Sequence, residues 1–382
     1  KEVSEGNREL RGELDAKLAR FKDYKVEQGK AISPDATTQE LLATAKALDT
    51  EYILQATINS DKNRITAKLL NVEDGQNFWS KTVREGDMVG EGDFIDEATG
   101  FIAAHVAGHD GAIHRDILKK ALVKKEEDLT PMELLQLGKS LWEDSTSENT
   151  IKAIEYLNRC IKLNPEISTA YGILSEVYLE DIRGFYNKYP DAMTKAKDMA
   201  ARGVELEPSN AIALIEQIWI SWYENDFAAV EVQMEAALKA NPYEALVQAS
   251  VGSFYASTGV DYEKGKKHLD LAIKYNDTPQ GWYYVGYIFY YMSKGDYDSA
   301  LEYGLKSSYN SQFVLPLVTS LFWLVENEES ALSYYQRIKK DIPNYSTEEL
   351  DRFLGVFHYA PESRKRILEA FIEVETAAKA SE

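Results

Sequence analysis

The chain has 382 residues, 44% of them hydrophobic and 28% charged, a composition that excludes a disordered or fibrous protein. Its 63 acidic residues outnumber its 43 basic ones, and a net charge of −20 argues against a broad surface that neutralises nucleic-acid or lipid phosphates. The longest apolar run, Phe313 to Val325, is shorter than the roughly 20 residues that cross a bilayer. We therefore expect a neutral, basic or apolar partner, no nucleic-acid binding and no membrane insertion.

The single cysteine, Cys160, excludes an intramolecular disulfide framework and a cysteine-ligated zinc site. The chain opens with Lys1 rather than Met and has no signal-peptide pattern, so we expect it to be part of something longer. A cytoplasmic location is expected, with a periplasmic one as the alternative.

The first third of the chain mixes helical and strand patterns. Apolar residues at helical spacing predict an amphipathic helix over Val3 to Phe21, and a short strand is expected over Tyr24 to Glu27. Thr37 and Thr38 are candidate N-caps of a second helix, with Glu40 in its first turn.

Three strands in series are predicted next. They are Tyr52 to Ile58, Arg64 to Val72 and Phe78 to Val83. The segments between them, 59–63 and 73–77, are rich in Asn, Asp and Gly, which favours antiparallel hairpins. A helical segment follows from Asp93 to about Lys124, with an interruption near Gly108 to Gly111.

The order of elements from Leu10 to Val83 resembles a TolB amino-terminal-like domain, a small α+β module of many bacterial regulators. The similar stretches are 13–21, 48–56 and 64–72, followed by Asp74-Gly75 and Phe78-Trp79-Ser80. Such modules begin with an apolar strand, whereas this chain starts almost at the first helix. Either that strand lies upstream of Lys1 and leaves an exposed sheet edge, or the domain is a variant. We expect this α+β domain over residues 1–126.

The rest of the chain repeats a helix-pair pattern with a period of about 34 residues. The clearest copy is Trp282-Tyr283-Tyr284-Val285-Gly286-Tyr287-Ile288-Phe289, followed by Gly295-Asp296-Tyr297-Asp298-Ser299-Ala300. It resembles the tetratricopeptide-repeat pattern W-x2-L-G-x2-Y, then A-x3-F-x2-A. The small residues Gly286 and Ala300 stand where the two helices of a repeat approach each other closely.

Five further copies are expected, most of them closed by a proline. These prolines are Pro165, Pro208, Pro242 and Pro343. An insertion, Leu179 to Lys195, should form a protruding loop or an extended helix. The segment Thr347 to Ala377 is expected to form two amphipathic helices that cap the last apolar face. The predicted fold is mostly α: the small α+β domain, six repeats over 130–343 in a right-handed α-solenoid, and capping helices over 344–382.

Candidates for catalysis are few. His105, His109 and His114 have a spacing that can suit a metal, but Gly108 and Gly111 weaken the helix there, so a structural or solvated role is favoured over a metal site. No phosphate-binding loop, nucleophile elbow or recognisable carboxylate pair is present in the sequence. His268, His358 and Cys160 are expected to be structural, and the acidic loop over 86–93 does not fit a calcium loop. We expect no enzyme, no cofactor and no metal.

Aromatic residues stand where the first helices of the repeats should face a concave groove. The candidate partner-binding residues are Trp142, Ile215, Trp219, Trp222, Tyr223, Tyr283, Tyr287, Tyr290, Tyr291 and Trp323. Such residues are typical of binding hot spots, so we expect a protein or peptide in the groove. In that case Trp219, Trp222, Tyr287 and Tyr291 should be partly exposed on one continuous surface. The alternative is that the aromatic side chains only fill a tight superhelix.

The two resemblances imply the sensory or partner-docking part of a bacterial signalling or transcription-regulatory protein. Families with this pairing often carry an upstream winged-helix DNA-binding domain or a nucleotide cyclase domain. One alternative is a free-standing scaffold or assembly factor that uses the same groove. A distant alternative is a metal-dependent enzyme at His105, His109 and His114.

Overall fold

The computed structural model describes residues 5–27, 36–59, 63–87, 93–143, 146–183, 188–307 and 314–380. The chain forms two compact units, Lys1–Leu129 and Thr130–Glu382, each described by itself below. Several parts of the sequence-based expectations lie outside the described residues: Val3, residues 60–62 of the first hairpin turn, residues 88–92 of the acidic loop, residues 184–187 of the predicted insertion, Phe313, and residues 381–382 of the predicted cap and tail. Within the described residues no helix is long and apolar enough to span a membrane.

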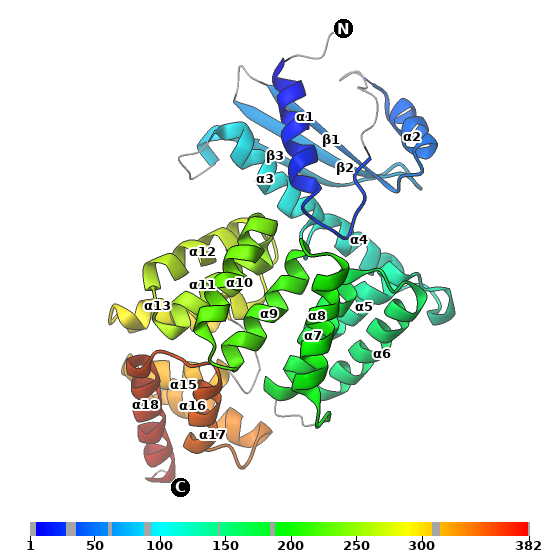
Figure 1. Ribbon diagram of the computed structural model, residues 1–382. Helices are drawn as coiled ribbons and strands as arrows, with labels where there is room; N and C mark the ends of the chain where they lie inside the picture. Colours follow the sequence, from blue (N-terminus) through cyan, green and yellow to red (C-terminus); the bar gives the residue numbers. More distant parts are fainter. Residues whose placement is uncertain are drawn as a thin grey trace. The chain divides into compact units, whose positions relative to one another are not determined.

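The first unit is a three-stranded antiparallel sheet with helices (Figure 1). Its elements are α1 Glu5–Leu18, α2 Thr38–Ala47, β1 Tyr52–Asn59, β2 Arg64–Asn71, β3 Asn77–Arg84, η2 Glu85–Asp87, α3 Phe94–Ala107, α4 Ala112–Ala121 and η3 Glu126–Asp128. The strand order is β1-β2-β3, with Ala67 of β2 opposite Ala56 of β1 and Lys81 of β3. Thr37 and Glu40 form a capping box at the start of α2. The three predicted strands, their antiparallel pairing and the break between α3 and α4 are confirmed.

The strand predicted over Tyr24 to Glu27 is wrong. Residues 21–27 have no strand pairing. Side chains hold this segment instead, because Asp23 Oδ2 lies 3.2 Å from His114 Nε2 and the Tyr24 ring lies 5.1 Å from the His114 ring.

One buried charge in this unit is fully surrounded by acceptors. Lys17 of α1 donates from Nζ to Asp96 Oδ1 at 2.6 Å, to Asp96 O at 2.7 Å and to Thr99 Oγ1 at 2.7 Å, all on α3. Glu13 Oε2 lies 3.1 Å from Nζ and is a fourth acceptor for its three N–H groups. A buried ammonium is tolerated when its donors are satisfied in this way, and here it joins α1 to α3.

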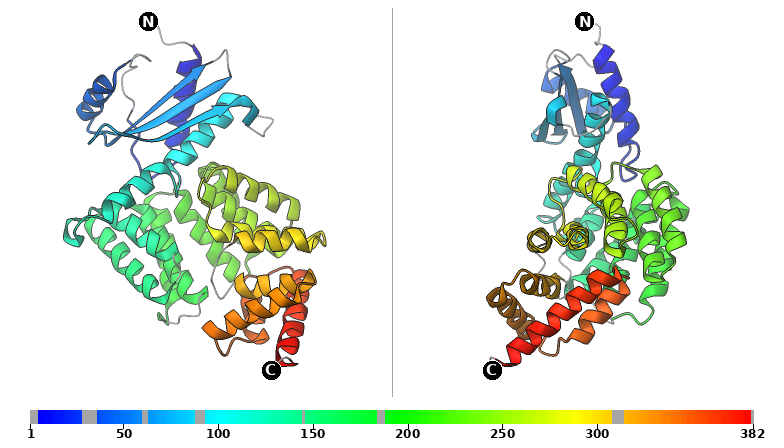
Figure 2. Two further views of the ribbon diagram at one scale, coloured as in Figure 1. Left: turned by 180° about the vertical axis from the view of Figure 1, so that it is seen from behind. Right: turned by 90° about the vertical axis from the view of Figure 1, so that its left-hand side faces the viewer.

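The second unit is built from six helix pairs (Figures 1 and 2). The pairs are α5 Pro131–Glu143 with α6 Ser147–Leu163, α7 Ser168–Arg183 with α8 Ala192–Leu206, α9 Ala211–Tyr223 with α10 Phe227–Ala240, α11 Ala245–Thr258 with α12 Tyr262–Lys274, α13 Val285–Ser293 with α14 Tyr297–Lys306, and α15 Val314–Leu324 with α16 Glu328–Asp341. A short helix, η4 Gly281–Tyr284, precedes α13. The mostly helical fold class, a small α+β unit followed by a solenoid of helix pairs, is confirmed.

Glycines allow the helices of this unit to pack closely. A Cβ atom on Gly252 would lie 2.8 Å from the Leu269 backbone nitrogen and 2.9 Å from the Gly265 carbonyl oxygen. On Gly286 it would lie 2.8 Å from Leu269 Cδ1. The close packing predicted at Gly286 is present, but the predicted partner is wrong: its nearest atoms belong to Leu269 of α12 and Ser253 of α11 in the preceding pair, not to the second helix of its own repeat. Helix α7 extends to Arg183, into the segment predicted as an insertion.

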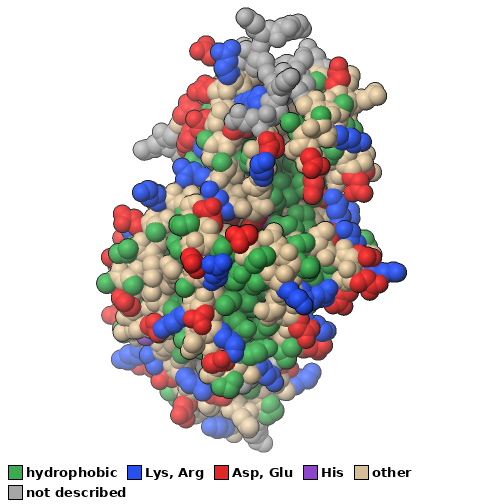
Figure 3. All heavy atoms as spheres, turned by 45° about the vertical axis from the view of Figure 1, so that its right-hand side comes forward, with side chains coloured by type: hydrophobic (Ala, Val, Ile, Leu, Met, Phe, Trp, Pro, Cys, Tyr) green, Lys and Arg blue, Asp and Glu red, His purple; other side chains and the backbone are tan. Residues whose placement is uncertain are grey.

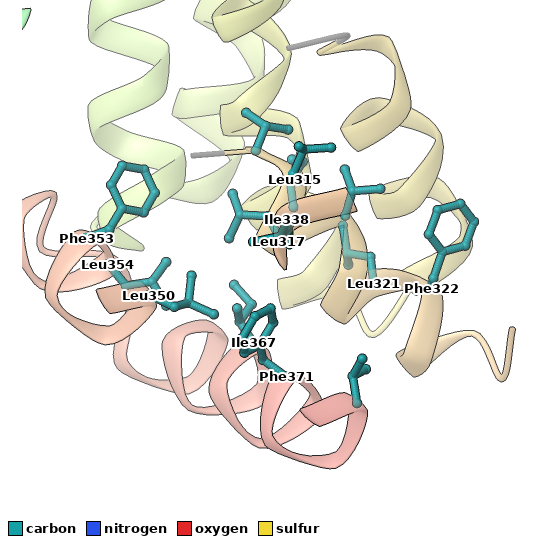
Figure 4. Packing of buried hydrophobic residues seen from close by; sticks show 14 of the residues in the cluster. Leu315, Leu317, Leu321, Phe322, Ile338, Leu350, Phe353, Leu354, Ile367 and Phe371 are labelled. Carbon is teal, nitrogen blue, oxygen red and sulfur yellow. The ribbon is translucent and has the colours of Figure 1, made fainter. Parts of the chain in front are cut away.

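Two further helices, α17 Thr347–Val356 and α18 Pro361–Ala380, end the unit as expected for a cap. Figure 4 shows their apolar side chains, including Leu350, Ile367 and Phe371, against Leu317 and Leu321 of α15. The turn between α17 and α18 also reaches the middle of the solenoid. There the Trp222 indole Nε1 donates to Phe357 O at 2.8 Å, and the Ala360 N–H donates to Ser257 O at 2.8 Å.

Candidate binding pocket

A pocket of about 1040 Å³, part of it open to solvent, lies inside the second unit. The first helix of every pair contributes to its wall, as do η4 and the cap. Its aromatic lining residues are Trp142 (α5), Trp219 and Trp222 (α9), Trp282 (η4), Phe353 (α17), and Phe357 and Tyr359 (between α17 and α18). Pockets that bind ligands typically combine such apolar walls with a few polar groups.

The tryptophans of α9 form the centre of the aromatic wall. The rings of Trp219 and Trp222 are stacked at 4.9 Å with 9° between their planes. Trp282 meets Trp219 edge-on at 5.9 Å. The hydrogen bond from Trp222 to Phe357 O fixes the inner ring, because its only donor is used by the cap.

Four charged residues line the same pocket as the aromatic side chains. Glu176, Glu180 and Arg183 share one face of α7 because they are four and three positions apart, and Glu216 comes from α9. Arg183 donates from Nε to Glu180 Oε2 at 3.0 Å and from Nη2 to Glu176 Oε1. Its guanidinium also lies 5.9 Å from the centre of the Trp219 ring. The pocket thus contains three carboxylates and one guanidinium.

These carboxylates have acceptor atoms that no protein donor fills. Among the described residues, Glu176 Oε2 and Glu216 Oε2 are buried and accept no hydrogen bond, and Ser253 Oγ, also in the pocket wall, has no partner either. Glu216 is only 1% exposed. Burial raises the pKa of Glu216 well above its usual range, and the neighbouring Glu176 raises it further. Burial also raises the pKa of Glu180 to about 6.

A hydrogen bond joins the first pair to the segment just before η4. Gln280, just before η4, donates from Nε2 to Glu143 Oε1 at the end of α5 at 2.9 Å. Each of the two bonded residues lies close in sequence to a tryptophan of the pocket lining: Trp142 of α5 and Trp282 of η4. Figure 3 shows one face of the molecule, on which hydrophobic side chains gather in a hollow and charges of both signs are interspersed around it.

Four of the ten residues predicted from the sequence line the pocket: Trp142, Ile215, Trp219 and Trp222. The expectation that Trp219, Trp222 and Tyr287 would be partly exposed is wrong, because their exposed fractions are 7%, 2% and 3%. The cap covers Trp222, and a neighbouring ring covers Tyr287. Their role in binding a partner stays a prediction.

The predicted tyrosines of the fifth pair lie outside the pocket lining. Tyr287 stacks on Tyr303 at 4.4 Å and donates to Asp270 Oδ1 at 2.8 Å, and Tyr291 stacks on the same Tyr303 at 5.3 Å. The single continuous surface expected for the two tryptophans and these two tyrosines is therefore wrong: the tyrosines pack between α12, α13 and α14.

The remaining predicted residues have varied surroundings. Tyr283 is fully buried, whereas Tyr290 is half-buried with its hydroxyl near Glu263. Trp323 of α15 is half-buried and donates to Glu373 of α18. The ring of Tyr223 packs against Phe357 at 5.5 Å, and burial raises the pKa of its hydroxyl.

Two histidines of the first unit, His105 and His114, hold local structure. His105 Nδ1 lies 2.7 Å from Phe101 O, and His114 Nδ1 lies 2.8 Å from Gly108 O. With Asp23 at the other nitrogen of His114, this imidazole links three segments. In the second unit His268 Nδ1 contacts Gln248 Oε1 at 2.6 Å, and burial lowers the pKa of His268 to about 4.

Sequence reasoning missed the charged wall. Glu216 is the single charged residue in the α9 sequence AIALIEQIWISWY, and such an isolated charge in an apolar helix was a usable signal. Glu176, Glu180 and Arg183 also gave a signal through their helical spacing. The sequence contains no such signal for Phe357 and Tyr359, because their position in the pocket depends on the contact of the cap with α9 and α11.

No protein-family model and no curated protein matches the chain. Among solved structures it is similar to PilF of Pseudomonas aeruginosa, with 16% identity, a TM-score of 0.40, and coverage of 60% of this chain and 99% of that one. It is also similar to PilW, described as a widely conserved type IV pilus biogenesis factor, with 17% identity, a TM-score of 0.40, and coverage of 55% and 92%. A third is a tetratricopeptide repeat protein from Parabacteroides merdae, with 12% identity, a TM-score of 0.34, and coverage of 69% and 100%.

Proposed function

We propose that this chain is a non-catalytic protein-interaction module whose second unit binds a segment of a partner protein in its pocket. The observation that carries the proposal is the pocket itself, since the first helices of all six pairs direct aromatic and apolar side chains into one space. Aromatic side chains provide large contact area together with polar atoms, which is why they dominate binding hot spots.

The finer part of the proposal is a regulatory role. The resemblance of residues 10–83 to TolB amino-terminal-like modules supports a sensory or docking part of a cytoplasmic bacterial regulator, with the output carried by another domain. A scaffold that assembles other proteins would use the same pocket. Both roles require that the pocket binds a segment of a partner, and binding experiments on the full chain test this requirement.

Two tryptophans offer a matched test of the pocket. Trp282 lines the pocket, whereas Trp323 does not. Both side chains are half-buried. The indole N–H of Trp282 donates to a side-chain oxygen of Gln280, and that of Trp323 donates to one of Glu373. Peptides selected from a random display library on the full chain should bind Trp282→Ala at least 30-fold more weakly, the effect of about 2 kcal/mol at a hot spot. Trp323→Ala should bind them as the wild type does.

Circular dichroism and thermal unfolding would confirm that both variants are folded. Selected peptides that bind the two variants equally well would contradict the proposal, as would a library that yields no specific binder.

A further inference from the structure

The wall of the pocket carries more negative than positive charge. Glu176, Glu180 and Glu216 face a single guanidinium, that of Arg183, which is bonded to the first two. Glu216 forms no ion pair with a described residue of the pocket lining, and Arg183 lowers its pKa less than burial and Glu176 raise it. A buried carboxylate without an ion-pair partner is costly, so in the empty pocket it holds a proton, in line with its raised pKa.

The free acceptor atoms lie on neighbouring carboxylates. The charge of Glu176 and a hydrogen bond between the two carboxyl groups both raise the pKa of Glu216, and each residue has an Oε2 atom that accepts from no other residue. Two carboxylate oxygens and the hydroxyl of Ser253 thus offer several acceptors in the lining of the pocket. Such a set accepts a cation and repels an anion.

The aromatic part of the pocket suits the same ligand. Arg183 already shows how this wall holds a guanidinium, with carboxylates at its edge and the Trp219 ring within 5.9 Å. Cations are attracted to the faces of indole rings, and the attraction is larger where water is excluded. The pocket also has enough apolar surface to cover the aliphatic stem of a long side chain.

We infer that the pocket binds the cationic side chain of a lysine or arginine in a partner's segment, with its charge at Glu216 and Glu176 and its stem among the tryptophans. The inference rests on the proposed function and specifies the chemistry of the partner. On binding, the ligand's cation replaces the proton held by Glu216, and that proton passes to the solvent. The net charge of −20 favours the approach of a basic segment.

The probes are pools of acetylated heptapeptide amides without tryptophan, with random Ala, Leu, Ser and Gln flanks and one fixed central residue. The central residue is arginine, lysine, citrulline, norleucine or glutamate; citrulline has nearly the shape of arginine without its charge. Binding to the full chain is followed by intrinsic fluorescence, because four of the six tryptophans line the pocket.

The arginine or lysine pool should bind at least tenfold more tightly than its neutral counterpart, the gain of about one charged hydrogen bond in a buried site. The glutamate pool should bind worst. Glu216→Gln should remove most of this preference. Glu263→Gln, which removes a surface carboxylate paired with Lys294 at 2.7 Å, is the control and should leave the preference as in the wild type.

Several outcomes would overturn the inference. Equal affinity for the arginine and citrulline pools would do so while leaving the proposed function intact, provided that Trp282→Ala weakens both. Equal binding of N-acetylarginine amide and the peptides would assign the pocket to small organic cations instead. If no pool binds, the inference fails, and the display-library selection decides whether the proposed function fails as well. Should Glu216→Gln fold poorly, the comparison of arginine with citrulline on the wild-type chain decides alone.

Discussion

The second unit contains two groups of aromatic side chains that differ in what surrounds their polar atoms. In the tyrosine cluster (Tyr284, Tyr287, Tyr291 and Tyr303), the Tyr287 hydroxyl donates to Asp270, and the ammonium of Lys306 lies 4.4 Å from the Tyr303 ring centre. The pocket tryptophans (Trp142, Trp219, Trp222 and Trp282) instead share their space with carboxylate oxygens that lack donors. Aromatic content alone therefore does not distinguish a packed cluster from the proposed binding pocket, whereas the unfilled acceptors do.

The largest effect is expected where the pocket and the core coincide. Trp222→Ala should lower the free energy of unfolding by about 3–5 kcal/mol, because the ring is 2% exposed, packs on Phe254 at 5.3 Å and is bonded to Phe357 O. Urea unfolding measures the loss. A decrease below about 1 kcal/mol would show that the cap does not depend on this ring.

A substitution beside the tyrosine cluster should affect stability alone. Gly286→Leu places a side chain against Leu269, which lies 2.8 Å from the position of its Cβ atom, and should cost about 1–3 kcal/mol by overpacking. Peptide affinity measured well below the melting temperature should remain that of the wild type. A selective loss of binding would mean that the tyrosine cluster belongs to the site.

The unfilled acceptors predict a pH dependence of stability. Since the pKa of Glu216 is raised in the folded chain, the folded state holds a proton that the unfolded state releases above about pH 4.5. The contribution of Glu216 is therefore fully favourable below that pH and is lost as the pH rises toward its folded pKa. Glu216→Gln should then unfold at higher urea than the wild type at pH 7, with a difference that shrinks toward pH 4.5. A difference that is constant between these pH values would contradict the buried, protonated state.

The smallest effects are expected from hydroxyl groups of the tyrosines. Tyr287→Phe removes the bond to Asp270 and should cost about 1 kcal/mol. Tyr290→Phe, at the surface beside Glu263 and Lys294, should change stability by less than about 0.5 kcal/mol. Thermal unfolding of the pair compares a buried hydroxyl with a surface one, and equal shifts would show that burial of the Tyr287 hydroxyl has no energetic effect.

Local patterns predicted most of the elements. The strands, the capping box at Thr37 and the helix pairs follow from periodicity, turn residues and small residues at helix crossings, and all of these act within a few residues of sequence. The Tyr24 to Glu27 segment has strand-like residues but no strand beside it, so side chains of α4 and the segment hold it instead. A strand needs a partner, and a short pattern does not reveal one.

The pocket could be predicted only in part. Trp142, Ile215, Trp219 and Trp222 were found because the repeat register assigns each of them to a first helix. The burial of Trp222 could not be foreseen, since this ring is covered by a turn more than 130 positions away in the sequence. The charge of Glu216 within the apolar sequence of α9 could have been used as a signal, whereas the prediction was based on aromatic residues alone.

The contact between the cap turn and the middle helices alters how the solenoid should unfold. In an open array each repeat contacts only its neighbours, so unfolding can begin at either end and spread. Here Trp222 and Ser257 are bonded to the turn after α17, and Gln280 is bonded to Glu143 of α5, so distant repeats depend on one another. Fraying of the last helices would expose the centre of the array. We therefore expect hydrogen exchange in α9 and α11 to accelerate together with exchange in α18, as one cooperative unit, instead of a gradient along the chain.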